Sequence, residues 1–102
     1  MDARVAKCLL VSKVLVADGI MTENERTFLD KMMQTLGLDE TQRRRVLDLE
    51  GWDQAEPAVA KLTVEEKREF VAMLVDASSA DGRLSPLEMA TVKRITLALG
   101  VE

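Results

Sequence analysis

Residues 16–38 of this chain read VADGIMTENERTFLDKMMQTLGL, and residues 79–101 read SADGRLSPLEMATVKRITLALGV. The two stretches align without a gap at a constant offset of 63 residues. The identical pairs are Ala17 and Ala80, Asp18 and Asp81, Gly19 and Gly82, Glu25 and Glu88, Leu36 and Leu99, and Gly37 and Gly100. These pairs fall at a turn, at a helix start and at a helix end, where chance matches are improbable. The pattern predicts an internal duplication, in which each half is a helix–Asp-Gly turn–helix hairpin.

Helix boundaries are marked at several points along the chain. In a capping box, a Ser, Thr or Asp side chain bonds the amide three residues on and a Glu or Gln there bonds back, which stabilises the helix start by about 1 kcal/mol. The four boxes are Thr22 with Glu25, Asp39 with Gln42, Thr63 with Glu66, and Ser85 with Glu88. The glycines that can close a helix in the left-handed conformation are Gly19, Gly37, Gly51, Gly82 and Gly100. We therefore predict helices over about 2–17, 22–36, 39–50, 54–61, 63–80 and 85–99.

The composition agrees with an all-α fold. Of the 102 residues, 47% are hydrophobic but only 3% are aromatic, a balance that suits helices better than strands. No segment alternates with a period of two, so no strand is predicted. The length fits a single domain over residues 1–102. We predict a compact bundle of about six helices with a pseudo-twofold axis, whose repeat halves at about 2–38 and 63–101 are joined by helices within 39–61.

The apolar residues also predict which helices are buried. Residues 3–17 and 70–80 are apolar on nearly all sides, which indicates two buried central helices. Cys8 lies in the first of these runs, so we expect a buried and unreactive thiol. Leu87 and Leu97 lie off the apolar stripe of the last helix, and they are either covered by the middle segment or exposed to a partner.

Charge and residue types exclude several classes of function. The net charge is −4, and an acidic surface repels nucleic acids and anionic membranes, so we expect a protein partner or a cation instead, with a homodimer left open. Residues 5–17 are too short to span a bilayer. The single cysteine indicates a reducing compartment, and we expect a cytoplasmic protein that reaches a membrane only through a partner. The absence of His removes the commonest general base, so we predict no catalytic residue and no enzymatic activity.

The Asp-Gly turns are where the sequence points to function. Helix-end glycines and capping boxes account for Gly19, Thr22, Glu25 and their counterparts without any ligand. Asp18 and Asp81 are explained less well, because an acid at a helix C-terminus faces the negative end of the helix dipole. If the two turns meet, four carboxylates come together. They would either raise some of their own pKa values or recruit a hard divalent ion such as Ca²⁺ or Mg²⁺.

The same residues are similar to the second half of an EF-hand loop, which has Gly at its sixth position and Glu at its last. The first half of that loop does not match. Its first position would be Val14 or Ala77 and its third Val16 or Ser79, where oxygen ligands are required. An ordinary EF-hand is therefore not expected, and a metal site here would need carboxylates from both halves.

The doubled motif resembles the TerB-like domain, which occurs in tellurite-resistance operons and beside J-domains in membrane-anchored co-chaperones. Residues 16–25 and 80–88 carry the resemblance together with the closing 36–38 and 99–101, so it covers nearly the whole chain. It implies an all-α accessory domain in metalloid or envelope stress responses that binds metal through acidic residues. By position, the implied metal ligands are Asp18, Glu25, Asp81 and Glu88. The alternative is a metal-free protein interaction module whose Asp-Gly turns only shape the fold.

Overall fold

One apolar helix lies at the centre of the molecule. In the computed structural model, which describes residues 2–17, 19, 21–78 and 85–101, α1 spans Ala3–Leu15 and contacts each of the other five helices. Nine of its thirteen residues are buried. They include Leu9, Leu10 and Leu15, which are fully inaccessible to solvent. The prediction of a buried first helix is confirmed, because an element that is apolar on all sides must be surrounded by others.

Five further helices follow in chain order. They are α2 (Glu23–Thr35), α3 (Glu40–Leu47), α4 (Trp52–Ala60), α5 (Val64–Ser78) and α6 (Pro86–Leu99). Every helix predicted from the sequence is present, with boundaries that differ by a few residues, and the part of the chain that the structure describes contains no strand. The all-α prediction is confirmed.

Local hydrogen bonds explain why the helices begin where they do. All four predicted capping boxes form. In the box of α3, the amide of Asp39 donates to Gln42 Oε1 over 3.0 Å and the amide of Gln42 donates to Asp39 Oδ1 over 2.8 Å. The Gln at this position therefore closes a box as well as a Glu does. These bonds satisfy amide groups that have no partner within the first turn of a helix.

Of the five predicted helix-closing glycines, two are confirmed, whereas Gly19 lies beyond Val16, the C-cap of α1, and Gly82 lies outside the described residues. Gly37 and Gly100 both have φ of 72°, and the residue after each bonds back across the last turn. Gly51 does not close α3 as predicted. That helix ends at Leu47, and Leu49 takes the left-handed conformation with φ of 55°. Gly51, at φ of 83°, is instead the N-cap of α4. The short connection between α3 and α4 therefore contains two left-handed residues.

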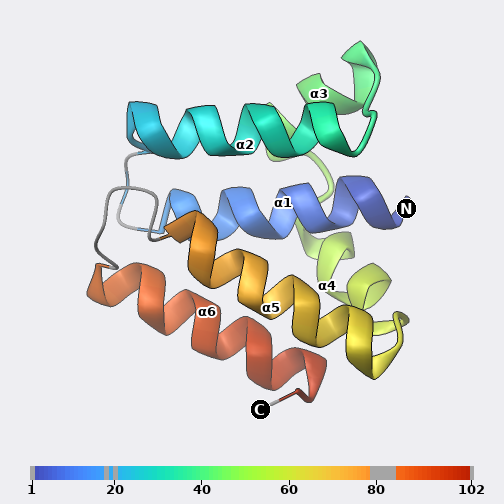
Figure 1. Cartoon of the computed structure of the whole chain (residues 1–102), viewed down its shortest axis with the longest axis vertical. Coiled ribbons are helices and arrows are strands. Elements are labelled where there is room, and N and C mark those ends of the chain that lie inside the picture. The colour runs from blue at the N-terminus through green and yellow to red at the C-terminus, as the bar shows by residue number, and fades with distance from the viewer. Residues whose placement is uncertain (1, 18, 20, 79–84, 102) are drawn as a thin grey trace.

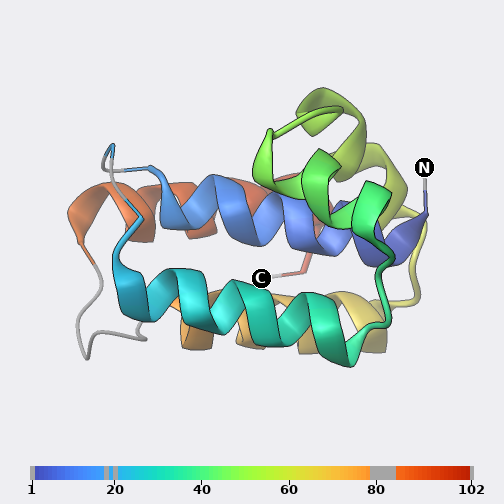
Figure 2. The same ribbon diagram turned by 90° about the horizontal axis from the view of Figure 1, so that it is seen from above.

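Four helices form a bundle and two cover one end of it. Figures 1 and 2 show α1, α2, α5 and α6 side by side, with α3 and α4 against the N-terminal part of α1. At the opposite end, α1 and α5 finish while α2 and α6 begin (Figure 1). The Arg4 guanidinium donates to the carbonyl of Leu36 over 3.0 Å, which ties the start of α1 to the end of α2. At the other end of the bundle, the first turns of α2 and α6 lie at the same end of the molecule (Figure 1).

The prediction that residues 70–80 form a second central helix is wrong for α5. Phe70 and Leu74 are buried, but Val71 and Met73 are only half-buried and Val75 is 39% exposed. The reason is geometric: α5 lies on the outside of the bundle, where only one side of a helix can face the core. The pseudo-twofold repeat stays a prediction, since Asp18 and residues 79–84, which include the second Asp-Gly turn, lie outside the described residues.

Candidate functional site

The helix arrangement brings two acidic side chains of the predicted site into contact. Glu25 is the third residue of α2 and Glu88 the third residue of α6. They are 63 positions apart in the sequence, yet their carboxyl groups interact directly. Both are deeply buried, with exposed fractions of 3% and 4%. Glutamates are almost never buried to this extent unless they have a partner.

Helix capping uses one oxygen of each carboxyl group. The amide of Thr22 donates to Glu25 Oε1 over 2.9 Å, and the amide of Ser85 donates to Glu88 Oε1 over 3.1 Å. The box of α5 does the same with Glu66, which is exposed to solvent. Capping alone therefore does not require a buried glutamate. The burial of Glu25 and Glu88 must therefore have a cause other than capping.

The second carboxylate oxygen of Glu88 shows what the pair lacks. Within the described residues, Glu88 Oε2 is buried and has no hydrogen-bond donor. Burial, followed by the interaction with the Glu88 side chain, raises the pKa of Glu25 from 4.5 to about 7. A proton on Glu25 would give the pair a hydrogen-bond donor. Two buried carboxylates cannot both remain charged at low cost, so the pair needs either a shared proton or a cation.

The structure describes two of the four residues predicted as metal ligands. It brings Glu25 and Glu88 together, whereas Asp18 and Asp81 lie outside the described residues. Among the residues that are described, no group of three or more acidic, His or Cys side chains is placed to hold a metal ion. The described part of this end thus offers two carboxylates, both on helix starts.

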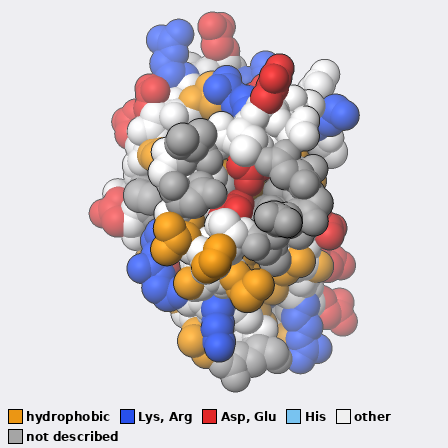
Figure 3. All heavy atoms as spheres, turned by 90° about the vertical axis from the view of Figure 1, so that its left-hand side faces the viewer, with side chains coloured by type: hydrophobic (Ala, Val, Ile, Leu, Met, Phe, Trp, Pro, Cys, Tyr) orange, Lys and Arg blue, Asp and Glu red, His pale blue; other side chains and the backbone are white. Residues whose placement is uncertain are grey.

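The surface at this end of the bundle combines acidic and apolar side chains. Figure 3 views it directly and shows acidic atoms in the middle of the face, with hydrophobic side chains gathered below them. In the first turn of α6, Leu87 is 56% exposed and Met89 is 54% exposed. The sequence pattern placed Leu87 off the apolar stripe of the last helix, but it did not single out Met89. Both residues flank the buried Glu88 in the helix, so they point away from the core.

The one cysteine of the chain does not contribute to this site. Cys8 lies inside α1 and is fully buried. Burial raises the pKa of its thiol to about 12, so the thiol stays protonated at neutral pH. The prediction of a buried thiol is confirmed.

Comparison with models of protein families shows which family the chain belongs to. The family model described as "Tellurite resistance protein TerB" matches residues 4–102, which is essentially the whole chain. The chain belongs to the TerB family. No match was found among curated proteins or among solved structures. The resemblance seen in the doubled motif is therefore confirmed, and the six helices are those of a TerB domain. No helix in the described part of this TerB domain is long and apolar enough to cross a membrane.

Proposed function

We propose that this TerB domain is a non-enzymatic accessory domain that binds a divalent cation, Ca²⁺ or Mg²⁺, at its two buried helix-start glutamates, as part of a metalloid or envelope stress response. The observation that carries the proposal is the buried Glu88 Oε2, which has no donor among the described residues. Beside it lies Glu25, whose carboxyl is also buried. A cation between the two would replace the proton that the pair otherwise needs.

The chemistry of the donor set suits a hard cation. Ca²⁺ takes six to eight oxygen ligands and Mg²⁺ six, with water completing the set. Two glutamates are too few for tight binding by themselves. We propose that Asp18 and Asp81 supply the further carboxylates. Support comes from the repeat, because each Asp precedes its glutamate by seven positions, 18 to 25 and 81 to 88. Because these positions match, we also propose that a pseudo-twofold axis relates the two halves of the chain.

An accessory role without catalysis fits the residue types. The chain has no His, and its one thiol is buried and protonated inside α1. A nucleophile paired with a general base therefore has no obvious source. The single cysteine also supports the proposal of a cytoplasmic location.

Calorimetric titration of chelator-treated protein with Ca²⁺, Mg²⁺ and Mn²⁺ tests the metal site. We expect heat and a rise in the melting temperature with the wild type, and a loss of both in Glu88→Gln. Glu66→Gln is the matched control, because it changes a glutamate of a solvent-exposed capping box. Gln42 shows that a Gln side chain still closes such a box. No heat and no thermal shift at millimolar ion would overturn the metal proposal.

A metal-free protein interaction module is the second candidate. The observation in its favour is that the pair can satisfy itself with a single proton, since the pKa of Glu25 is raised to about 7 by burial and by Glu88. The double variant Asp18→Asn with Asp81→Asn separates the candidates. Loss of partner binding in a folded variant, with no effect of metal on either protein, would favour this second function.

A further inference from the structure

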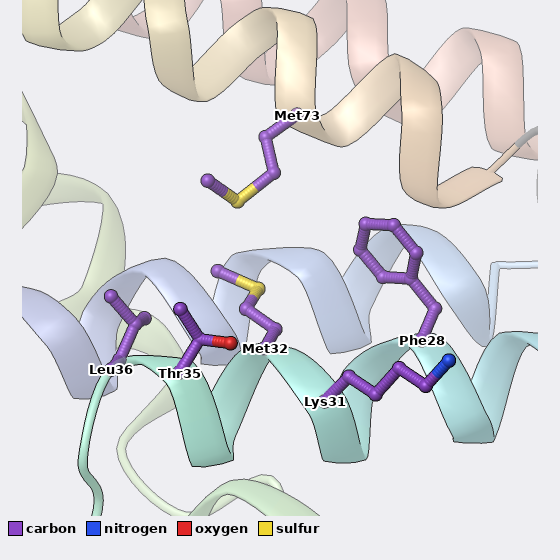
Figure 4. Close-up of a pocket in the computed structure, with 6 residues that line it drawn as sticks. All are labelled: Phe28, Lys31, Met32, Thr35, Leu36 and Met73. Carbon is purple, nitrogen blue, oxygen red and sulfur yellow. The ribbon is translucent and has the colours of Figure 1, made fainter.

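A groove runs between α2 and α5. Its volume is about 290 Å³. The residues that line it are Phe28, Lys31, Met32, Thr35, Leu36 and Met73 (Figure 4). This volume is just below the range of about 300–1,000 Å³ for pockets that enclose a whole small ligand. The groove is therefore suited to a few inserted side chains.

The apolar walls have the spacing of a helix. Phe28 and Met32 of α2 and Leu36, the C-cap of that helix, follow one another at four-residue intervals, so they form one row. Met73 reaches toward this row from α5 (Figure 4). Two of the four side chains are methionines, which adapt their shape to an inserted group more readily than branched residues do. A row of this kind accepts apolar side chains that are themselves one helical turn apart.

The two edges of the groove carry opposite charges. On the α2 edge stands Lys31, which is exposed. On α5, Glu69 and Asp76 are exposed and lie one turn before and one turn after Met73, on the same side of that helix. None of the three forms an ion pair with another described residue. A bound helix would meet a cation along one edge and anions along the other.

We propose that this groove docks an amphipathic helix of a partner protein. The helix would place two apolar residues, one turn apart, against Phe28, Met32 and Met73. An acidic residue on one flank would face Lys31, and a basic residue on the other flank would face Glu69 and Asp76. This docking surface is independent of the metal site proposed at Glu25 and Glu88, and it would serve either of the two candidate functions.

The test uses ¹⁵N-labelled protein in a chelator and two synthetic helical peptides of about 14 residues. One carries Leu at positions i and i+4 with Glu on one flank and Lys on the other, and the second has these charges exchanged. Exposed ion pairs contribute about 0.2–1 kcal/mol each, so we expect a roughly three- to tenfold preference for the complementary peptide. Amide shifts should centre on the α2 and α5 residues that line the groove.

Charge reversal makes the test sharper. The variant Lys31→Glu, Glu69→Lys, Asp76→Lys changes only exposed side chains, so it should fold and should prefer the exchanged peptide instead. Leu97→Gln, on the exposed side of α6, is the control and should bind as the wild type does. Equal binding of the two peptides, no binding at millimolar peptide, or shifts on α6 would overturn the proposal. Self-association that the charge reversal abolishes would also overturn it, because a second copy would then be the occupant.

Discussion

Replacing Glu25 by Gln should make the metal-free protein more stable while removing its response to cations. Glu25 accepts the amide of Thr22 through Oε1, and Gln42 shows that a Gln side chain performs the same capping role in α3. The helix start is therefore preserved. The new NH₂ group can also donate to the Glu88 carboxylate, whose Oε2 otherwise has no donor among the described residues. One substitution thus removes a buried charge and supplies a missing hydrogen bond.

The size and the pH range of the effect follow from the pKa of Glu25. In the folded protein, burial and Glu88 raise this pKa from 4.5 to about 7. Between these two values the unfolded chain releases its proton first, so the stability of the wild type falls as the pH rises. Each pKa unit corresponds to 1.36 kcal/mol, which makes the full cost roughly 3 kcal/mol above pH 7. Glu25→Gln escapes this cost, and the two proteins should be equally stable near pH 4.

Urea unfolding followed by circular dichroism, in a chelator and from pH 4 to pH 8, measures this difference. At pH 8 we expect Glu25→Gln to exceed the wild type by up to roughly 3 kcal/mol. Glu66→Gln, in the exposed box, should change stability by less than about 0.5 kcal/mol. Adding a divalent ion at a hundredfold excess over its dissociation constant should stabilise only the wild type, by about 2.7 kcal/mol. A variant less stable than the wild type at pH 8, or one with the same pH slope, would refute the reasoning.

Three further predictions concern the fold. Gly37→Ala should destabilise the protein by about 1–2 kcal/mol, because its φ of 72° is unfavourable for any residue with a Cβ; an unchanged urea midpoint would contradict this. Leu9→Ala, in the centre of α1, should cost about 2–5 kcal/mol, whereas Leu87→Ala should cost less than about 0.5 kcal/mol because Leu87 is 56% exposed. Equal melting temperatures for these two variants would show that the assigned burial is wrong. Cys8 should react with a thiol reagent only as fast as the chain opens, since burial raises its pKa to about 12; rapid labelling of the native protein would disprove this.

The helices of this protein were predictable because their signals are local. A capping box such as that of Thr22 and Glu25 involves residues three positions apart, so both partners are visible in a short stretch of sequence. The family followed from the same stretches. The prediction that Gly51 closes α3 was wrong, because Gly51 caps the start of α4 and Leu49 takes the left-handed conformation after the end of α3. When a residue other than glycine takes the left-handed conformation, as Leu49 does, the sequence gives no reliable sign of it.

Only the tertiary structure decided which surfaces these helices share. The sequence by itself determined that Glu25 and Glu88 are capping residues, and it named both as candidate ligands. It did not determine that their carboxyl groups meet, nor that Met73 faces Phe28 across a groove. The side of α5 that stays exposed was likewise not predictable. Such contacts join residues far apart in the chain, and they depend on how the helices pack around α1, whereas a cap or a turn depends only on its neighbours.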